Sequence, residues 1–205
     1  MQKRKILVLF AHPRSENQGV NVRMAEAART IPGVTVVDLY AEYPRFDIDV
    51  DREQERLVAH DVVVFQHPMF WYSTPAILKE WQDLVLEYGF AYGSQGRALE
   101  GKLFLSAVTT GGDREAYTTA GYQHFPVHEL LRPIEQTACL CHMVWLPPLV
   151  LYAAGHAEEE GRLAPHIARY RGLLEDLRDH RLDPTAAARY DLMGDYLDTH
   201  RTEAR

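Results

Sequence analysis

The loop QHPMFWYSTP at 66–75 places four large apolar side chains in a row between two prolines, directly after an apolar run. Loops are usually polar, because their backbone and tip face water. The prolines stiffen the ends of the loop, so the backbone amides of 69–72 could face the edge of a flat ring while Trp71 or Tyr72 stacks on it. We therefore predict that a flat aromatic ligand covers this loop. An aromatic cluster that seals the rim of the core is the alternative, above all for Phe70.

The stretch HPRSENQGVN at 12–21 carries polar residues that suit a phosphate. It lacks both the GxGxxG fingerprint of dinucleotide sites and the GxxxxGK[ST] fingerprint of nucleoside triphosphate sites. It leads into a predicted helix, whose unpaired first N–H groups and positive dipole end stabilise an anion. An N-capping turn without a ligand would use the same residue types. The side chains that could donate to a phosphate are His12, Ser15, Asn17, Gln18 and Asn21.

The stretch TTGG at 109–112 supplies two hydroxyl groups and two glycines. Because they have no side chains, Gly111 and Gly112 let the backbone approach a ring edge closely. A Gly-Gly pair after a strand is also a common turn, so this motif is weak when it stands alone. Together, the three stretches suit a flavin, which is a flat ring system that carries a phosphate.

Five apolar, β-rich runs alternate with five segments of helical spacing. The strands are predicted at 5–11, 34–40, 61–66, 102–110 and 143–154, and the helices at 21–29, 51–60, 75–88, 130–140 and 163–178. Runs such as VVVF are apolar throughout, which is typical of strands buried between two helical layers. We predict an α/β fold, a flavodoxin-like doubly wound five-stranded parallel sheet with helices on both faces. The three loops would then meet at the carboxyl edge of the sheet, where such folds bind ligands.

The 205-residue chain is long enough for one domain with a substantial core. We predict a flavin-binding domain over 1–182 and a separate tail over 183–205. The tail opens with Asp-Pro-Thr, a helix-start signal, and carries Tyr190, Met193 and Leu197 at spacings near one turn. This segment could dock on the domain, dock on a second subunit or fray.

Composition and charge narrow the class of protein. A hydrophobic content of 46% and a charged content of 25% are typical of a globular protein, and no apolar run approaches the roughly 20 residues of a membrane span. The start MQKRKILVLFAHP indicates a first strand rather than a signal peptide. A net charge of -7 argues against a nucleic-acid surface. Cys139 and Cys141 are expected to be reduced, as in the cytoplasm, and the histidines show no ligand-like clustering, so no metal is assigned.

Several motifs of the chain are shared with a known family. They are AHP at 11–13, QHPMFWYSTPAILKEW at 66–81, GFAYG at 89–93, LEGK at 99–102, TTGG at 109–112 and LLRPIEQTACLCHMVWLPP at 130–148. By these motifs the chain resembles the flavodoxin-like NAD(P)H:quinone oxidoreductases, including the small flavoproteins that act as ancillary subunits of glutathione-regulated potassium efflux systems. The resemblance implies flavin contacts from His12, Gln18, Gly19, Val20, Asn21, Met69, Phe70, Trp71, Tyr72, Thr109, Thr110, Gly111 and Gly112.

The resemblance also implies a cofactor and a pair of catalytic residues. The cofactor is expected to be FMN, because no additional adenine site is evident, and FAD is the alternative. The larger members of the family place a tyrosine and a histidine after TTGG to assist hydride transfer. Tyr117 falls at the matching distance. The histidine corresponds most closely to His124, which lies one residue further along than the pattern, and Tyr122 and His128 are the alternatives.

The function implied is two-electron hydride transfer from NAD(P)H through the flavin to a quinone, with one pocket serving both substrates in turn. A second possible function is that of a regulatory subunit that binds and activates a potassium–proton antiporter. A third is that of a flavodoxin that carries electrons. The protein would be cytoplasmic, or peripheral on the inner face of the cell membrane.

A homodimer is expected as well. The mouth of the site would hold more aromatic side chains than one flavin can cover, and large exposed apolar patches usually mark interfaces. These aromatic residues are Phe70, Trp71, Phe90, Tyr92, Phe125 and Trp145.

Overall fold

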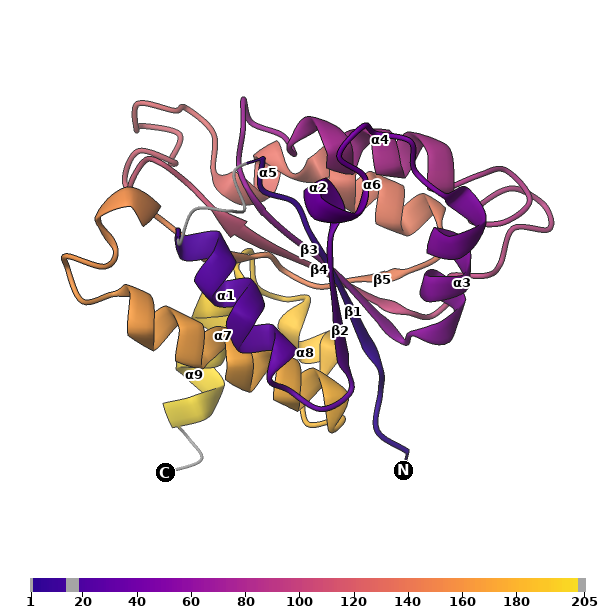
Figure 1. The fold of residues 1–205 in the computed structure, drawn as a ribbon. Helices are drawn as coiled ribbons and strands as arrows, with labels where there is room; N and C mark the ends of the chain where they lie inside the picture. Colours follow the sequence, from indigo (N-terminus) through magenta and orange to yellow (C-terminus); the bar gives the residue numbers. More distant parts are fainter. Residues whose placement is uncertain (1, 14–18, 203–205) are drawn as a thin grey trace.

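The computed structural model describes residues 2–13 and 19–202. At its centre lies a parallel sheet in the order β2-β1-β3-β4 (Figure 1). Both β5 and β6 pair with β4. The predicted flavodoxin-like α/β architecture is thereby confirmed. The strands are β1 (Ile6–Phe10), β2 (Val34–Asp38), β3 (Val62–Pro68), β4 (Leu103–Thr109), β5 (Val144–Trp145) and β6 (Leu149–Leu151).

The fifth predicted strand, 143–154, is interrupted. Its first piece, β5, pairs with Leu103 and Phe104 of β4, whereas β6 pairs with the end of β4 at 107–109. Between the two pieces lie Pro147 and Pro148, which have no N–H group to donate to a ladder. The edge strand is therefore in two parts, and the second part lies beside the strand end that leads into TTGG.

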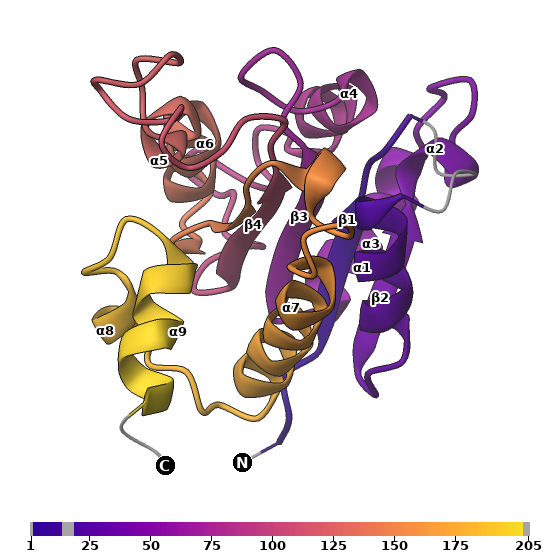
Figure 2. The same cartoon turned by 90° about the vertical axis from the view of Figure 1, so that its left-hand side faces the viewer.

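Helices cover both faces of the sheet, as the sequence predicted (Figure 2). Strand side chains alternate between the two layers, so Leu7 joins one core cluster and Ile6 the other. One layer contains α2 (Leu39–Glu42), α3 (Val50–Ala59), α4 (Ala76–Val85), α5 (Val127–Leu130) and α6 (Arg132–Leu140). The other contains α1 (Val20–Arg29), α7 (Leu163–Arg178), α8 (Pro184–Ala187) and α9 (Met193–Thr202). A 3-10 turn, η1 (Ala154–His156), follows β6.

The helices differ from the prediction in several places; the helix predicted at 75–88, for example, ends at Val85. Helix α2 was not predicted, because four residues are too few for a periodic pattern; the Asp38 side chain caps it by accepting from the Tyr40 N–H (3.1 Å) and the Ala41 N–H (3.2 Å). The predicted helix 130–140 begins earlier and is divided at Leu131 into α5 and α6. Within the described ranges, no helix is long and apolar enough to cross a bilayer.

The C-terminal segment packs on the domain. Met193 of α9 is fully buried, and Tyr196 and Leu197 join the same core cluster as α7. The Met193 N–H donates to the Pro148 carbonyl (3.0 Å), which ties the start of α9 to the broken edge strand. Between Ala186 and Leu197 this segment contacts the core of the domain.

Candidate functional site

The three loops meet around one residue, Thr109, at the carboxyl edge of the sheet. The Met69 N–H donates to the Thr109 carbonyl (2.8 Å) and so joins the loop after β3 to the end of β4. Asn21 Nδ2 donates to Thr109 Oγ1 (2.7 Å) and so joins the start of α1 to the same strand end. Thr109 itself is buried. The expected juxtaposition of the three loops is therefore present.

A buried polar network fixes the start of α1 against the sheet. Gln66 is fully buried in β3, and its Nε2 donates to the Asn21 carbonyl (2.7 Å). The Tyr170 hydroxyl of α7 donates to Gln66 Oε1 (3.2 Å), and burial raises the pKa of this phenol, so that it stays protonated. Sequence reasoning missed both residues. A signal for Gln66 existed, because an amide inside an apolar run must find partners when it is buried.

Among the residues that the structure describes, those at the start of α1 suit an anion. Its N-cap, Gly19, provides no side-chain hydrogen bond, and its first turn, which begins at Val20, has no acidic residue. Asn21 Oδ1 is buried and has no hydrogen-bond partner among the residues that the structure describes. When the amide flips, Nδ2 takes this place and can donate, while Oδ1 accepts from the Thr109 hydroxyl. These unsatisfied groups fit a phosphate. The predicted contacts Ser15, Asn17 and Gln18 lie outside the described residues.

Two aromatic residues of the loop after β3 are in a strained conformation. Trp71 and Tyr72 have φ angles of +48° and +63°, in the left-handed region that bulky side chains rarely adopt. Trp71 is 92% exposed. Phe70 is also exposed, and its ring centroid lies 6.4 Å from that of the half-buried His12. Because such strain often occurs at functional sites, it supports a ligand-binding role for this loop.

The backbone amides of this loop are less free than the sequence suggested. Besides the bond from Met69 to Thr109, the Phe70 N–H donates to the Ser73 carbonyl (3.1 Å), and the Ser73 N–H returns a bond to Phe70 (3.0 Å). Of the four amides of 69–72, that of Met69 is therefore used by the bond to Thr109 and that of Phe70 by a tight turn, and the expectation that all four face a ligand is wrong. Among the backbone bonds of the described residues, the Trp71 and Tyr72 N–H groups have no acceptor.

The TTGG stretch leaves space where a ring edge would lie. A Cβ atom added at Gly111 would meet no described atom within 4 Å. At Gly112 an added Cβ would lie 3.2 Å from Tyr117 Cε2, so this glycine lets the tyrosine ring pack against the backbone. The loop is held in place by Thr110, which donates from N–H to Leu151 of β6 (3.0 Å) and from Oγ1 to the Gly112 carbonyl (2.8 Å).

Tyr117 lies buried behind TTGG, with 8% of its surface exposed. Its ring centroid is 6.0 Å from that of Tyr152. Burial raises the pKa of the Tyr117 phenol, and the nearby Tyr72 phenol raises it further. Tyr117 also lines a cavity of about 260 Å³ together with His128. A protonated phenol in a cavity wall can donate a hydrogen bond to an oxygen that gains negative charge.

The structure places the alternative relay residues in different surroundings. His124 is exposed, has a φ of +64° and is not among the described residues that line the cavity beside Tyr117. Tyr122 is 84% exposed. His128 is half-buried and shares the cavity with Tyr117, so it is the histidine that the geometry brings nearest to the predicted role.

The aromatic surplus at the mouth is smaller than expected. Phe90, Tyr92 and Trp145 pack against the core rather than at the mouth, and Trp145 stacks on Phe104 with ring centroids 5.5 Å apart. The expectation that all six aromatic residues surround the mouth is therefore wrong. The other three, Phe70, Trp71 and Phe125, are exposed.

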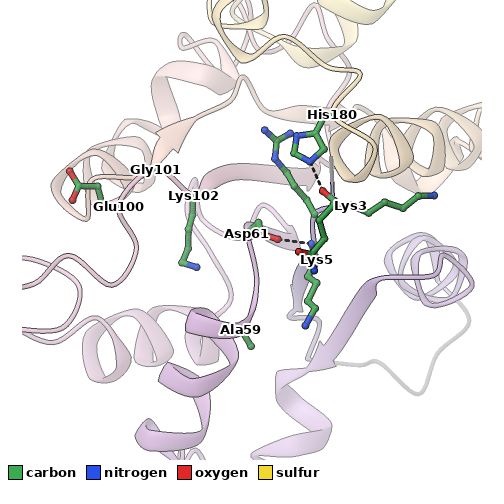
Figure 3. A pocket seen from close by; sticks show the side chains of 10 residues that line it. Lys3, Lys5, Ala59, Asp61, Glu100, Gly101, Lys102 and His180 are labelled. Atoms are coloured by element: carbon green, nitrogen blue, oxygen red, sulfur yellow. Dashed lines mark hydrogen bonds between the residues drawn. The ribbon is translucent and has the colours of Figure 1, made fainter.

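Another hollow, of about 510 Å³, lies at the opposite edge of the sheet (Figure 3). Lys3, Lys5, Asp61 and Lys102 are among the residues that line it. Two of its groups stabilise the local backbone: Asp61 Oδ2 accepts from the Lys5 N–H (2.8 Å), and Lys102 Nζ donates to the His60 carbonyl (2.5 Å). Since parallel α/β sheets bind ligands at the carboxyl ends of their strands, we place the site at the loops around Thr109.

The fold and this site define a class of protein: the chain belongs to the flavodoxin-like fold family, whose family model matches residues 4–174. Within that class, it is 46% identical over 179 residues to the glutathione-regulated potassium-efflux system ancillary protein KefG of Serratia proteamaculans (strain 568). That alignment covers 87% of this chain and 97% of the relative. The resemblance noted in the motifs is thereby confirmed.

Several solved structures have a similar fold. The general stress protein 14 of Treponema denticola, in complex with FMN, is 37% identical with a TM-score of 0.79, covering 84% of this chain and 99% of that one. An NADPH-quinone reductase from P. pentosaceus is 30% identical with a TM-score of 0.74, covering 82% and 95%. A thermophilic tryptophan halogenase from Streptomycin violaceusniger is 46% identical with a TM-score of 0.78, covering 80% and 95%.

Proposed function

We propose that this chain binds FMN at the carboxyl edge of its sheet and acts as an NAD(P)H:quinone oxidoreductase. The observation that carries the proposal is the junction at Thr109, which brings an open helix start, a strained aromatic loop and an unfilled glycine turn to one place. The FMN of the Treponema denticola relative and the activity of the P. pentosaceus relative support the choice of cofactor and reaction. Halogenation is not part of this proposal, because the FMN-bound relative and the NADPH-quinone reductase indicate a different chemistry.

Each part of the site would have its own role in binding or catalysis. The N–H groups at the start of α1 and the Asn21 amide would hold the phosphate. The TTGG backbone and the Trp71 and Tyr72 amides would face the ring edge, and Trp71 would cover one face of the ring. When bound, FMN supplies the group that accepts and returns hydride. Tyr117, protonated because burial raises its pKa, would donate to the oxygen of the acceptor.

Steady-state kinetics of the purified protein test this function. If NAD(P)H and quinone use one pocket in turn, double-reciprocal plots at several fixed quinone concentrations should give parallel lines, with NADH and NADPH tried separately. Lines that intersect would contradict the single pocket, and an absence of turnover with either nucleotide would contradict the activity itself.

A second function is favoured by the match to the potassium-efflux ancillary protein. We propose that the chain can also bind a potassium–proton antiporter at the cytoplasmic face of the membrane and activate it. The test is ion efflux through the antiporter in vesicles, with and without this protein and FMN. Efflux that does not respond to the protein, together with normal quinone turnover, would leave the enzyme as the only function.

We further propose a homodimer that covers the exposed aromatic residues of the mouth. Trp71, Tyr122 and Phe125 are 92%, 84% and 54% exposed, which is a large apolar surface for a single chain. Sedimentation should give twice the 23.5 kDa mass of the chain. A monomer at micromolar concentration would contradict the dimer without affecting the proposed activity.

A further inference from the structure

The C-terminal helices α8 and α9 lie beyond the residues 4–174 that the family model matches. They are nevertheless part of the folded core, on the same side of the sheet as α7 (Figure 2). Ala187 and Met193 are fully buried, and Leu192 is nearly so. This segment therefore adds a structural element, and one of its side chains contacts the loop that carries Tyr117.

An ion pair connects α9 to the loop that carries Tyr117. The two terminal nitrogens of Arg114 donate to Asp195 Oδ1 (2.9 Å) and Oδ2 (2.7 Å), which makes the pair bidentate. The hydrogen bond to Asp195 is the main cause that raises the pKa of Arg114. Arg114 stands between Gly112 and Tyr117 in the chain. The pair therefore links α9 to the loop that joins the glycine turn to the tyrosine.

The same segment forms one wall of the cavity beside Tyr117. Asp191, Leu192 and Asp195 line this space of about 260 Å³ together with Tyr117 and Tyr152. Burial raises the pKa of Tyr152 to about 12, so both phenols are neutral at physiological pH. The C-terminal segment thus lines the same cavity as the proposed hydrogen-bond donor, with Asp195 contributed by α9.

We infer that Asp195 is a positioning residue, which acts through Arg114 to hold Tyr117 in place behind the glycine turn. The inference about the loop rests only on the contacts above; its consequence for turnover rests on the proposed function. An acceptor that reaches the cavity beside Tyr117 would also contact Leu192, a residue outside the part that the family model matches.

A second ion pair on α9 provides a matched control. Arg169 of α7 donates to Asp198 Oδ1 (2.6 Å) and Oδ2 (3.2 Å), so it is bidentate as well. Asp198 lies about one turn after Asp195 on the same helix. This pair ties α9 to α7 and does not involve the loop at 113–117. Any effect that comes merely from loosening α9 should therefore appear in both pairs.

The experiment is a double-mutant cycle on the full chain with FMN added. The loop variants are R114A, D195A and R114A/D195A. The control variants are R169A, D198A and R169A/D198A. Amide hydrogen exchange reports the order of residues 113–121, and stopped-flow kinetics separates the reaction with NAD(P)H from the reaction with quinone. We expect each loop variant to speed exchange at 113–121 about threefold, in line with a partly exposed ion pair, and the double variant to do no more. The quinone step should slow by a similar factor while FMN affinity stays unchanged.

Three outcomes would overturn the inference. The first is unchanged exchange at 113–121 in D195A, and the second is an equal change at 113–121 in the control pair. The third is faster exchange with a quinone step of unchanged rate, because Tyr117 would then not depend on the ion pair. A wild-type protein without turnover would contradict the proposed activity. If D195A then still speeds exchange at 113–121 while D198A does not, the structural role of Asp195 stands.

Discussion

The double variant W71A/G111V should lose its flavin when it is purified, with an affinity for FMN about 100-fold weaker than that of the wild type, equal to about 2.7 kcal/mol. Stacking on an aromatic side chain is worth about 1–3 kcal/mol, and Trp71 is free to stack because it is 92% exposed. The valine side chain at position 111 would fill space that is open in the structure. Fluorescence titration with FMN measures the change.

The fold of this variant should stay intact. Trp71 makes few contacts with the core, and a Cβ at Gly111 meets no described atom within 4 Å, so far-UV circular dichroism should match the wild type. Y88A is the matched control, because Tyr88 is a 69% exposed aromatic residue that lies outside the site. Unchanged FMN affinity in W71A/G111V, or an equal loss in Y88A, would show that the site is elsewhere.

The second large effect is expected at Tyr117. Y117F should slow turnover about tenfold, at the lower end of general acid catalysis, because the phenol can no longer donate to the acceptor. H124Q should have a similar or larger effect if His124 is the second relay residue. FMN affinity should not change in either variant, and stopped-flow mixing of the reduced protein with quinone should show the loss.

His128 provides a control for the prediction about His124. His128 lines the cavity with Tyr117, whereas His124 is exposed. Wild-type turnover in H124Q with slow turnover in H128Q would therefore move the relay to His128. If substitution of Tyr117, Tyr122, His124 and His128 each leaves turnover unchanged, no side chain of this loop acts as an acid, and that part of the proposed mechanism is wrong.

The regular elements of this fold could be predicted because hydrophobic periodicity determines them. The helix predicted at 163–178 has those bounds in the structure, and the fully buried strands β1 and β3 follow the apolar runs. The division of the fifth strand was also accessible in principle, since Pro147 and Pro148 cannot donate to a sheet. The juxtaposition of the three loops follows from the topology alone, because parallel strands end at one edge.

What the sequence could not show depends on contacts between distant residues. The bonds from Tyr170 to Gln66 and from Gln66 to Asn21 join three separate elements. The left-handed conformation of Trp71 and Tyr72 opposes the ordinary preference of aromatic residues, so no local rule predicts it. The pairing of Arg114 with Asp195 depends on how the C-terminal segment packs, which the sequence left open.

The most direct test of the central claim is the absorption spectrum of the purified protein, with the released cofactor identified by chromatography and mass spectrometry. We predict a yellow protein that holds one FMN per chain, is bleached by NAD(P)H in the absence of oxygen and recovers its colour when quinone is added. FAD in place of FMN would change the cofactor and keep the site. A colourless protein that binds neither added FMN nor added FAD would contradict the account.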